Sequence, residues 1–185
     1  TTDQAVALQT NEPSATGAAY ISANSIQSDD YSVAKLLDDD INSHFHSSWG
    51  VAATDYHHLQ VYLGEGKSLA EFTFTYTTRN DGSTWTSPAP TVIEVYGSND
   101  PISFTDLLGT FTKDDNDLPA YTEAGASWTS PNIQPETSYE YIRFYVKESA
   151  GPGNNQFEGG YYFFAMSSFS LMSIGQPERY DVELT

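Results

Sequence analysis

The chain has 185 residues, enough for a single domain with a sizeable core, and its 25 acidic residues far outnumber its 7 basic ones. The resulting net charge of −18 excludes nucleic acid as a partner and disfavours anionic membranes and sulfated polysaccharides, because no basic cluster offsets it. The absence of cysteine excludes disulfides and thiolate zinc sites.

A run of acidic and aromatic residues is the first segment with a chemical pattern. Residues 32–37 (SVAKLL) favour a helix of one or two turns, and three adjacent carboxylates follow at 38–40. His44, His46 and Trp49 come directly after them. Such a stretch can serve as a catalytic centre, a metal site or a solvated acidic turn. Calcium suits crowded oxygen ligands best, and the ion would relieve the repulsion between the carboxylates.

Alternation of apolar and polar residues predicts strands further along the chain. In residues 69–79 (LAEFTFTYTTR), Phe72, Phe74 and Tyr76 fall on one side and polar residues on the other. Four more runs show strand patterns: 57–63, 91–99, 138–149 and 160–174. The last of these is long enough for two strands. Segments rich in Gly, Pro, Asn and Ser are predicted loops: 79–90 and 149–160. Many short strands separated by turn signals predict an all-β sandwich or barrel.

Five phrases follow one another in the order KLLDDDINSHFHSSW, HHLQVYLGEGKSLAEFTFTYTTRN, IEVYGSND, YEYIRFYVKES and FFAMSSFSLM. Taken together they resemble discoidin domains, also called coagulation factor five/eight type C domains, which include carbohydrate-binding module family thirty-two. FHSSW also resembles discoidin-like domains in surface proteins of Bacteroidetes. The resemblance implies a galactose-binding-like β-sandwich, a jelly roll of about eight strands, over residues 15–174. Residues 1–14 are then an N-terminal extension and 175–185 a C-terminal linker.

The same resemblance implies a structural calcium at the acidic turn, held by backbone carbonyls, one carboxylate and one hydroxyl, with further ligands from the closing strand. The implied ligands are Lys35, Asp38, Asp40, Ser43, Ser167 and Ser168. Two positions depart from the family pattern. Asp39 replaces a glycine with positive φ, a conformation that aspartate tolerates, and Ser168 replaces an anionic glutamate. We therefore expect weaker calcium binding than in typical relatives, and a solvated turn is the alternative.

Two loops carry the residue types that bind sugars, which are planar hydrogen-bonding groups and aromatic rings that cover a pyranose. Arg79 matches an arginine that contacts the sugar in galactose-binding relatives, and the loop before the closing strand is a second contact region of the family. His57 lies near the same rim. Of Tyr161 and Tyr162, which alternate, one is expected to face the core. The candidate ligand-binding residues are Arg79, Asn80, Trp85, His46, Asn154, Phe157 and Tyr161.

Other chemistries have less support in the sequence. His44 and His46 could hold zinc or iron if a third ligand joined them, but adjacent His57 and His58 point to opposite sides of a strand. Histidines packed in the domain or at its rim are the better interpretation. Neither a nucleophile elbow nor a glycine-rich phosphate loop is present, so nothing indicates catalysis.

The preferred function is a non-catalytic carbohydrate-binding module that captures galactose-type or amino-sugar-type chain ends for a larger secreted or cell-surface glycan-processing protein. The alternatives are a protein-adhesion discoidin domain and a purely architectural β-domain of a multidomain enzyme, with a small enzyme a distant fourth. We expect an extracellular, periplasmic or cell-surface location and a monomeric isolated domain. The chain reads as a mature chain or an excised module.

Overall fold

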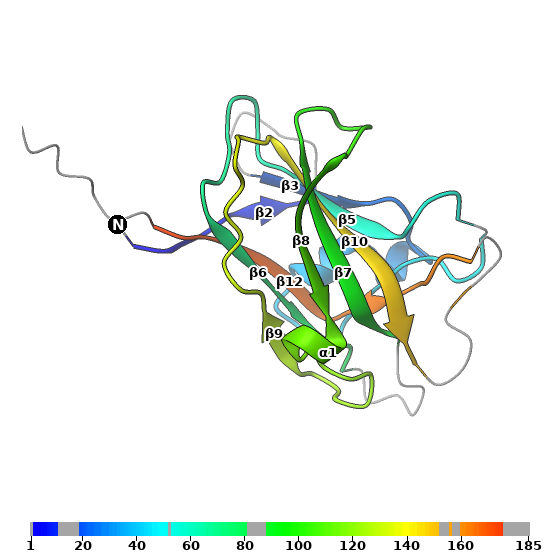
Figure 1. The fold of residues 1–185 in the computed structure, drawn as a ribbon. Coiled ribbons are helices and arrows are strands. Elements are labelled where there is room, and N and C mark those ends of the chain that lie inside the picture. Colours follow the sequence, from blue (N-terminus) through cyan, green and yellow to red (C-terminus); the bar gives the residue numbers. More distant parts are fainter. Residues whose placement is uncertain are drawn as a thin grey trace, which may run out of the picture.

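The computed structural model describes residues 2–10, 19–51, 53–80, 88–151, 156 and 160–175. Within these ranges, the eight strands of three or more residues form two facing sheets, which confirms the predicted all-β sandwich (Figure 1). These strands are β3 (Ala19–Ala23), β5 (His58–Tyr62), β6 (Phe72–Thr77), β7 (Ala89–Ser98), β8 (Asp106–Thr112), β9 (Ser127–Thr129), β10 (Tyr141–Ala150) and β12 (Ser168–Ser173). Four two-residue strands accompany them: β1 (Gln4–Ala5), β2 (Leu8–Gln9), β4 (Phe45–His46) and β11 (Ala165–Met166).

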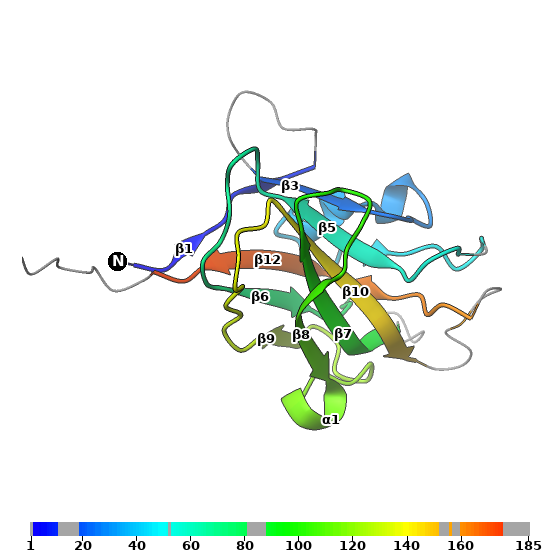
Figure 2. The ribbon, with the colours of Figure 1, turned by 45° about the horizontal axis from the view of Figure 1, so that its top comes forward.

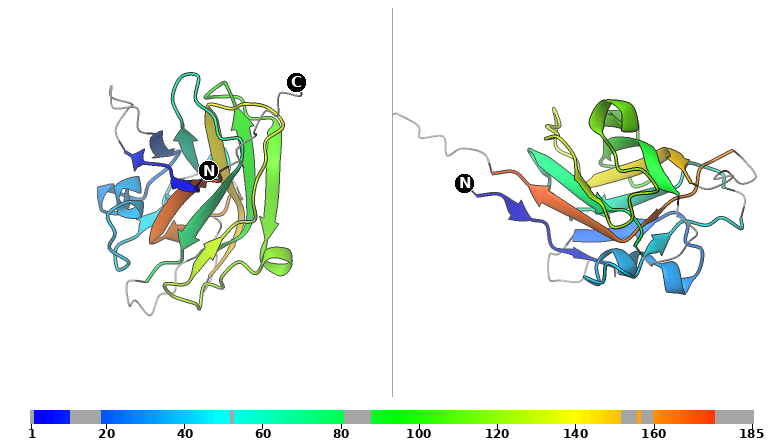
Figure 3. Two further views of the ribbon diagram at one scale, coloured as in Figure 1. Left: turned by 90° about the vertical axis from the view of Figure 1, so that its left-hand side faces the viewer. Right: turned by 90° about the horizontal axis from the view of Figure 1, so that it is seen from below.

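The strand order brings distant segments together at the ends of the sandwich. The larger sheet runs β2-β3-β5-β10-β7-β8 and the smaller one β1-β12-β6-β9, while β11 pairs with β4 at one end. Figure 2 shows β12, β6 and β9 side by side, and the left view of Figure 3 shows the sheets as two layers. Because the chain passes repeatedly from one sheet to the other, loops far apart in sequence meet at the same end.

The core between the sheets is centred on Phe74 of β6. Its ring centroid lies 5.6 Å from that of Phe111, 5.5 Å from Trp128, 4.9 Å from Phe144 and 6.1 Å from Phe169. These four rings come from β8, β9, β10 and β12, so a single side chain contacts strands of both sheets. Burial of aromatic rings of this size dominates the energetics of a core.

The other side of β6 is held by hydroxyl groups, as the alternation in its sequence predicts. Thr75 Oγ1 lies 2.7 Å from Thr129 Oγ1, and Thr77 Oγ1 lies 2.6 Å from Ser127 Oγ. Ser168 Oγ donates to Thr77 Oγ1 at 2.7 Å. Cross-strand pairs of this kind add stability to a sheet and keep the polar side of β6 satisfied.

The helices in the described ranges are short: η1 (Asp29–Tyr31), η2 (Val33–Leu36) and α1 (Lys113–Asn116). The helical turn predicted at 32–37 is therefore present, but as a 3-10 helix. Thr112 caps α1, since its side chain accepts a hydrogen bond from Asp115 N. Nowhere in the described ranges is a helix long and apolar enough to cross a membrane.

Six strands lie where the sequence predicts none: β1, β2, β3, β4, β8 and β9. Within the segment expected as an N-terminal extension, β1 pairs with β12 and β2 pairs with β3. The sequence of β8 gives little alternation because it is an edge strand, with Phe111 its one buried side chain. An edge strand buries few side chains, so its sequence shows little alternation between apolar and polar residues.

Candidate functional site

Aromatic packing fixes the end of the sandwich where β4 and β11 lie. Phe45 of β4 and Phe164 beside β11 are both fully buried, with ring centroids 5.4 Å apart. Ser47 N donates to Phe164 O at 3.0 Å, and Phe164 N donates to Ser47 Oγ at 2.9 Å. The two buried rings and the hydrogen bonds between their segments hold the neighbouring residues in place. His46 follows Phe45, and Phe163 precedes Phe164.

Arg79 and Asn80 follow β6 directly and reach the same end. Asn80 N donates to Ser167 Oγ at 3.1 Å, and Ala165 N donates to Pro88 O at 3.0 Å. These bonds attach both sides of the Arg79-containing connection to the segment around β11. The structure thus brings together the arginine region and the segment before the closing strand, 80 or more residues later in the chain.

His46 is a buried, neutral hydrogen-bond acceptor near Arg79. Its side chain is 4% exposed, and its Nδ1 lies 2.7 Å from Ser47 O. Because a carbonyl only accepts, the proton sits on Nδ1 and Nε2 keeps a free lone pair. Burial, with smaller contributions from His44 and Arg79, lowers the pKa of His46 from 6.5 to about 4. At neutral pH the site therefore combines a guanidinium donor with an imidazole acceptor.

Two aromatic rings contact His46. The ring centroid of Trp49 lies 4.5 Å from that of His46 at 76°, and Trp49 is 39% exposed at the rim. Phe163 lies on another side of His46, with a centroid distance of 5.9 Å. Phe163 is not among the predicted site residues. Its signal in the sequence is its place beside the core residue Phe164 in a run of four aromatics, where neighbouring rings point to different sides.

The remaining predicted ligand residues fall into two groups. Trp85, Asn154 and Phe157 lie outside the described residues. Tyr161 contacts Tyr56, with ring centroids 4.9 Å apart. The expectation that Tyr161 or Tyr162 faces the core is wrong, because both are half-buried and Phe164 supplies the core ring of this segment.

All four histidines are buried, with exposures of 7% or less, and they pack as the sequence analysis preferred. His57 Nδ1 lies 2.6 Å from Ser25 Oγ, and burial lowers the pKa of His57. His58 points to the outer face of the larger sheet, where its ring lies 4.9 Å from Tyr145. Among the described residues, no three His, Asp or Glu side chains are placed to hold a metal ion.

The acidic turn gathers mixed oxygen groups instead of a cluster of carboxylates. Ser43 Oγ lies 2.7 Å from Asp38 Oδ2 and 3.4 Å from Lys35 O. The backbone of Asp39 has a φ of 58°, so the aspartate does adopt the conformation for which relatives use glycine. Asp39 and Ser168 line one cavity, which places the turn beside the closing strand. Carbonyl, carboxylate and hydroxyl oxygens at one turn fit a calcium ion.

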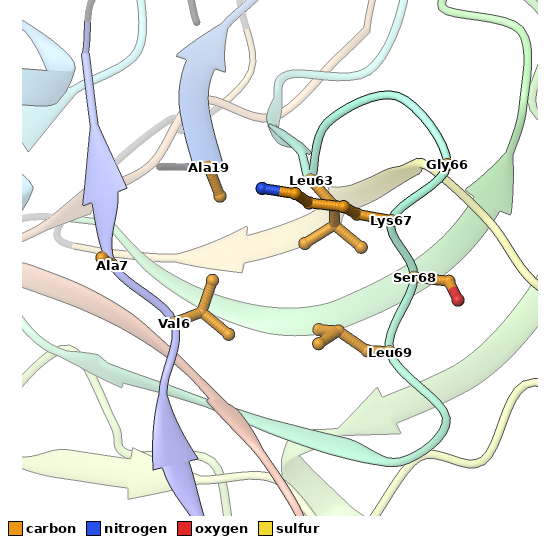
Figure 4. Close-up of a pocket in the computed structure, with 8 residues that line it drawn as sticks. All are labelled: Val6, Ala7, Ala19, Leu63, Gly66, Lys67, Ser68 and Leu69. Carbon is orange, nitrogen blue, oxygen red and sulfur yellow. The ribbon is translucent and has the colours of Figure 1, made fainter. Parts of the chain in front are cut away.

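A mainly apolar cavity of about 440 Å³ lies at the opposite end of the sandwich, between β1, β2 and the β5–β6 connection (Figure 4). Val6, Leu63 and Leu69 line it, and Lys67 brings the one cationic group among its lining residues. It lacks converging planar donors and acceptors. The His46 end therefore remains the better candidate for binding a polar ligand.

The sequence profile described as the F5/8 type C domain matches residues 20–157. The chain belongs to this family. Discoidin domain is another name for it, so the resemblance found in the sequence is confirmed. No curated protein matches the chain.

Solved structures show the same fold at low identity. A family 32 carbohydrate-binding module from Clostridium perfringens, in complex with GalNAc-β-1,3-galactose, is 17% identical, with a TM-score of 0.55 over 83% of this chain and 94% of that one. A putative chitobiase fragment from Bacteroides thetaiotaomicron is 15% identical, with a TM-score of 0.59 over 92% and 97%. A chitosan-binding module from Paenibacillus, in complex with chitotriose, is 16% identical, with a TM-score of 0.51 over 84% and 95%. These relatives establish the galactose-binding-like β-sandwich.

Proposed function

We propose that this domain is a non-catalytic carbohydrate-binding module whose site lies at the β4–β11 end of the sandwich. The observation that carries the proposal is the contact of the neutral acceptor His46 with the rings of Trp49 and Phe163, at the end of the sandwich that the chain reaches at Arg79 and Asn80. A guanidinium donates to two neighbouring hydroxyls, an imidazole nitrogen accepts from a third, and an aromatic ring covers the sugar's C–H face.

The charge of the protein favours neutral glycans. At a net charge of −18, sulfated or uronic sugars are repelled, whereas neutral hydroxyls are insensitive to the field. Structural relatives hold GalNAc-β-1,3-galactose and chitotriose. We therefore propose galactose-type or amino-sugar-type termini as the ligand class for this chain.

The biological setting follows from weak binding. A shallow rim site buries little sugar surface, so a free monosaccharide should bind at roughly millimolar strength, about −4 kcal/mol. Such affinity is useful when the module is tethered to a partner that acts on the same glycan, since tethering raises the local concentration. We place the domain in a larger secreted or cell-surface glycan-processing protein.

Arg79→Ala should weaken monosaccharide binding by about tenfold or more, below detection for a millimolar ligand, because hydrogen bonds to a charged donor contribute about 1.5–3 kcal/mol each. Titration by NMR against galactose, N-acetylgalactosamine, N-acetylglucosamine and a mucin-type glycan array measures this.

Lys67→Ala is the matched control, because it removes one positive charge at the opposite end of the sandwich. It should bind like the parent protein. Equal binding by Arg79→Ala and the parent would place the site elsewhere. Silence of the parent across all sugars and the array would contradict the carbohydrate proposal and favour an architectural domain.

We also propose that calcium binds the turn of Lys35, Asp38, Asp40 and Ser43, beside Ser168 of β12. The proximity of Ser43 Oγ to both Asp38 Oδ2 and Lys35 O supports it. The bound ion would fix the turn that leads into β4 and so into His46. Ser168 Oγ donates to Thr77. Because Ser168 stands where the family pattern has an anionic glutamate, we expect modest affinity for calcium.

Calcium at tenfold excess over its Kd should stabilise the protein by about 1.4 kcal/mol and raise Tm by roughly 3–5 °C. Asp38→Asn should abolish this rise, because it removes the anionic ligand. Asp100→Asn is the control, since Asp100 Oδ1 accepts from Ile102 N just as Asp38 Oδ1 accepts from Asp40 N. Calorimetry with calcium and with a chelator measures the shift. A parent Tm that is the same in both buffers would leave the turn as a solvated acidic loop.

A further inference from the structure

A second group of aromatic residues lies next to the proposed site, on the outer face of the larger sheet. Tyr56 precedes β5, Tyr145 and Lys147 belong to β10, and Tyr161 precedes β11. The ring centroid of Tyr56 lies 6.4 Å from that of Tyr145 and 4.9 Å from that of Tyr161. Lys147 Nζ lies 3.5 Å from the centroid of Tyr56. All four side chains are half-buried, so they form part of the surface; we call them the tyrosine cluster.

Contacts beneath the cluster hold Tyr145 in one orientation. Its ring packs at 4.9 Å against His58 and at 5.5 Å against Tyr96. Arg143 Nη1 donates to Tyr145 Oη at 2.7 Å, so the phenol oxygen accepts there and its own proton remains a donor for a ligand. Arg143 is itself fixed by Gln60 Oε1 and Pro101 O at 2.7 and 3.0 Å. A rigid tyrosine with a polar tip binds at low entropic cost.

The one charge within the cluster is compensated, and the Arg143 guanidinium beneath it is buried. Lys147 Nζ lies 3.5 Å from Glu94 Oε2, which compensates its charge. His58 is neutral at pH 7, because burial lowers its pKa to about 4. A ligand here meets rings, phenol hydroxyls and a compensated ion pair. This chemistry fits a neutral, hydroxyl-rich molecule better than an anion or a cation.

Two chain segments link the cluster to the proposed site. Tyr161 belongs to the cluster and Phe163 contacts His46, so the two sites are two residues apart along this segment, roughly 7 Å in extended chain. Along the second segment, Tyr56 precedes His57, and His57 lies close enough to His46 to lower its pKa. The separation is about the length of one sugar unit, so a glycan held at Arg79 and His46 can continue over the tyrosines.

We propose that the tyrosine cluster is a second subsite, which binds the next sugar unit of a neutral oligosaccharide whose terminal unit occupies the Arg79 end. This proposal rests on the carbohydrate-binding function proposed above and makes the domain selective for glycan chains over free monosaccharides. Tyr145 and Tyr56 cover the second sugar, and the Tyr145 hydroxyl donates to it.

Binding as a function of chain length tests the second subsite. N-acetylglucosamine is compared with its own trisaccharide, N,N′,N″-triacetylchitotriose, and N-acetylgalactosamine and galactose with GalNAc-β-1,3-galactose. In the parent protein the oligosaccharide should bind roughly three- to tenfold more tightly than its monosaccharide, the effect expected of one aromatic contact. Tyr145→Ala should remove this gain while monosaccharide affinity stays the same. Tyr145→Phe, which keeps the ring and the packing, should lose part of it.

Tyr62→Ala is the matched control, because Tyr62 is a half-buried tyrosine on the same face, stacked on Tyr141 at 4.5 Å. It should keep the full gain. Two results would overturn the subsite and leave the proposed function intact. One is equal affinity of the parent protein for monosaccharide and oligosaccharide. The other is an undiminished gain in both Tyr145 variants. If no sugar binds the parent protein, the proposed function fails and the subsite fails with it.

Discussion

Phe74→Ala should lower the free energy of unfolding by about 3–5 kcal/mol, a large fraction of the stability of a domain. The ring of Phe74 is 1% exposed and contacts Phe111, Phe144 and Phe169 from strands of both sheets. Removing the ring leaves a cavity between the two sheets. The sheets cannot close around this cavity without breaking hydrogen bonds between paired strands. The lost burial and the unfilled volume both contribute to the cost.

Urea unfolding followed by tryptophan fluorescence measures this change, with the slope m expected to stay constant. Leu107→Ala is the control, since Leu107 is 52% exposed and its removal should cost less than about 0.5 kcal/mol. Phe74→Leu should fall between the two. A cost below about 1 kcal/mol for Phe74→Ala would contradict a core centred on this ring.

Much of the fold was predictable because its central strands point apolar side chains into the core and polar side chains away from it. In β6, Phe72, Phe74 and Tyr76 face the core and alternate with threonines on the polar side. Strand β8 lies at the edge of its sheet and buries Phe111 alone, so its sequence carries no comparable period. Strands β1 and β2 are two residues long, too short for any period to show.

The candidate site was predictable only where a local motif carries it. The turn at Asp38 and the arginine at the end of β6 stand in recognisable phrases, and the positive φ of Asp39 agrees with the glycine that it replaces. Phe163 and Tyr145 gain their roles from segments that lie far away in the chain, around His46 and Tyr56. Contacts of this kind follow from the strand order, which no local pattern encodes.

Acidification from pH 7 to pH 5 should destabilise the protein through His46 and His58. Burial lowers the pKa of both to about 4, against 6.5 in the unfolded chain. Between these values the unfolded chain binds a proton that the folded protein does not, so stability falls as the pH falls through this window. Above pH 6.5 the effect is absent, and below pH 4 both states are protonated and no further loss occurs.

Each histidine should cost on the order of 2 kcal/mol between pH 7 and pH 5, and on the order of 3 kcal/mol by pH 4. The test stops at pH 5 because aspartate and glutamate are still mostly charged there, so the repulsion among the acidic residues changes little. Burial also lowers the pKa of His57, which adds to the loss in the same direction.

His46→Asn and His58→Asn separate these contributions. The Nδ1 atoms of His46 and His58 lie 2.7 Å from Ser47 O and 3.0 Å from Tyr56 O, and an asparagine amide can donate to the same carbonyls. Neither substitution changes a charge at pH 7, so long-range repulsion is equal in all proteins compared. Urea unfolding at pH 7 and pH 5 in one ionic strength should show each single variant losing about 2 kcal/mol less than the parent, and the double variant about 4 kcal/mol less. An equal loss in the parent and the double variant would assign the acid sensitivity to the carboxylates, and the buried histidines would then titrate near their ordinary pKa.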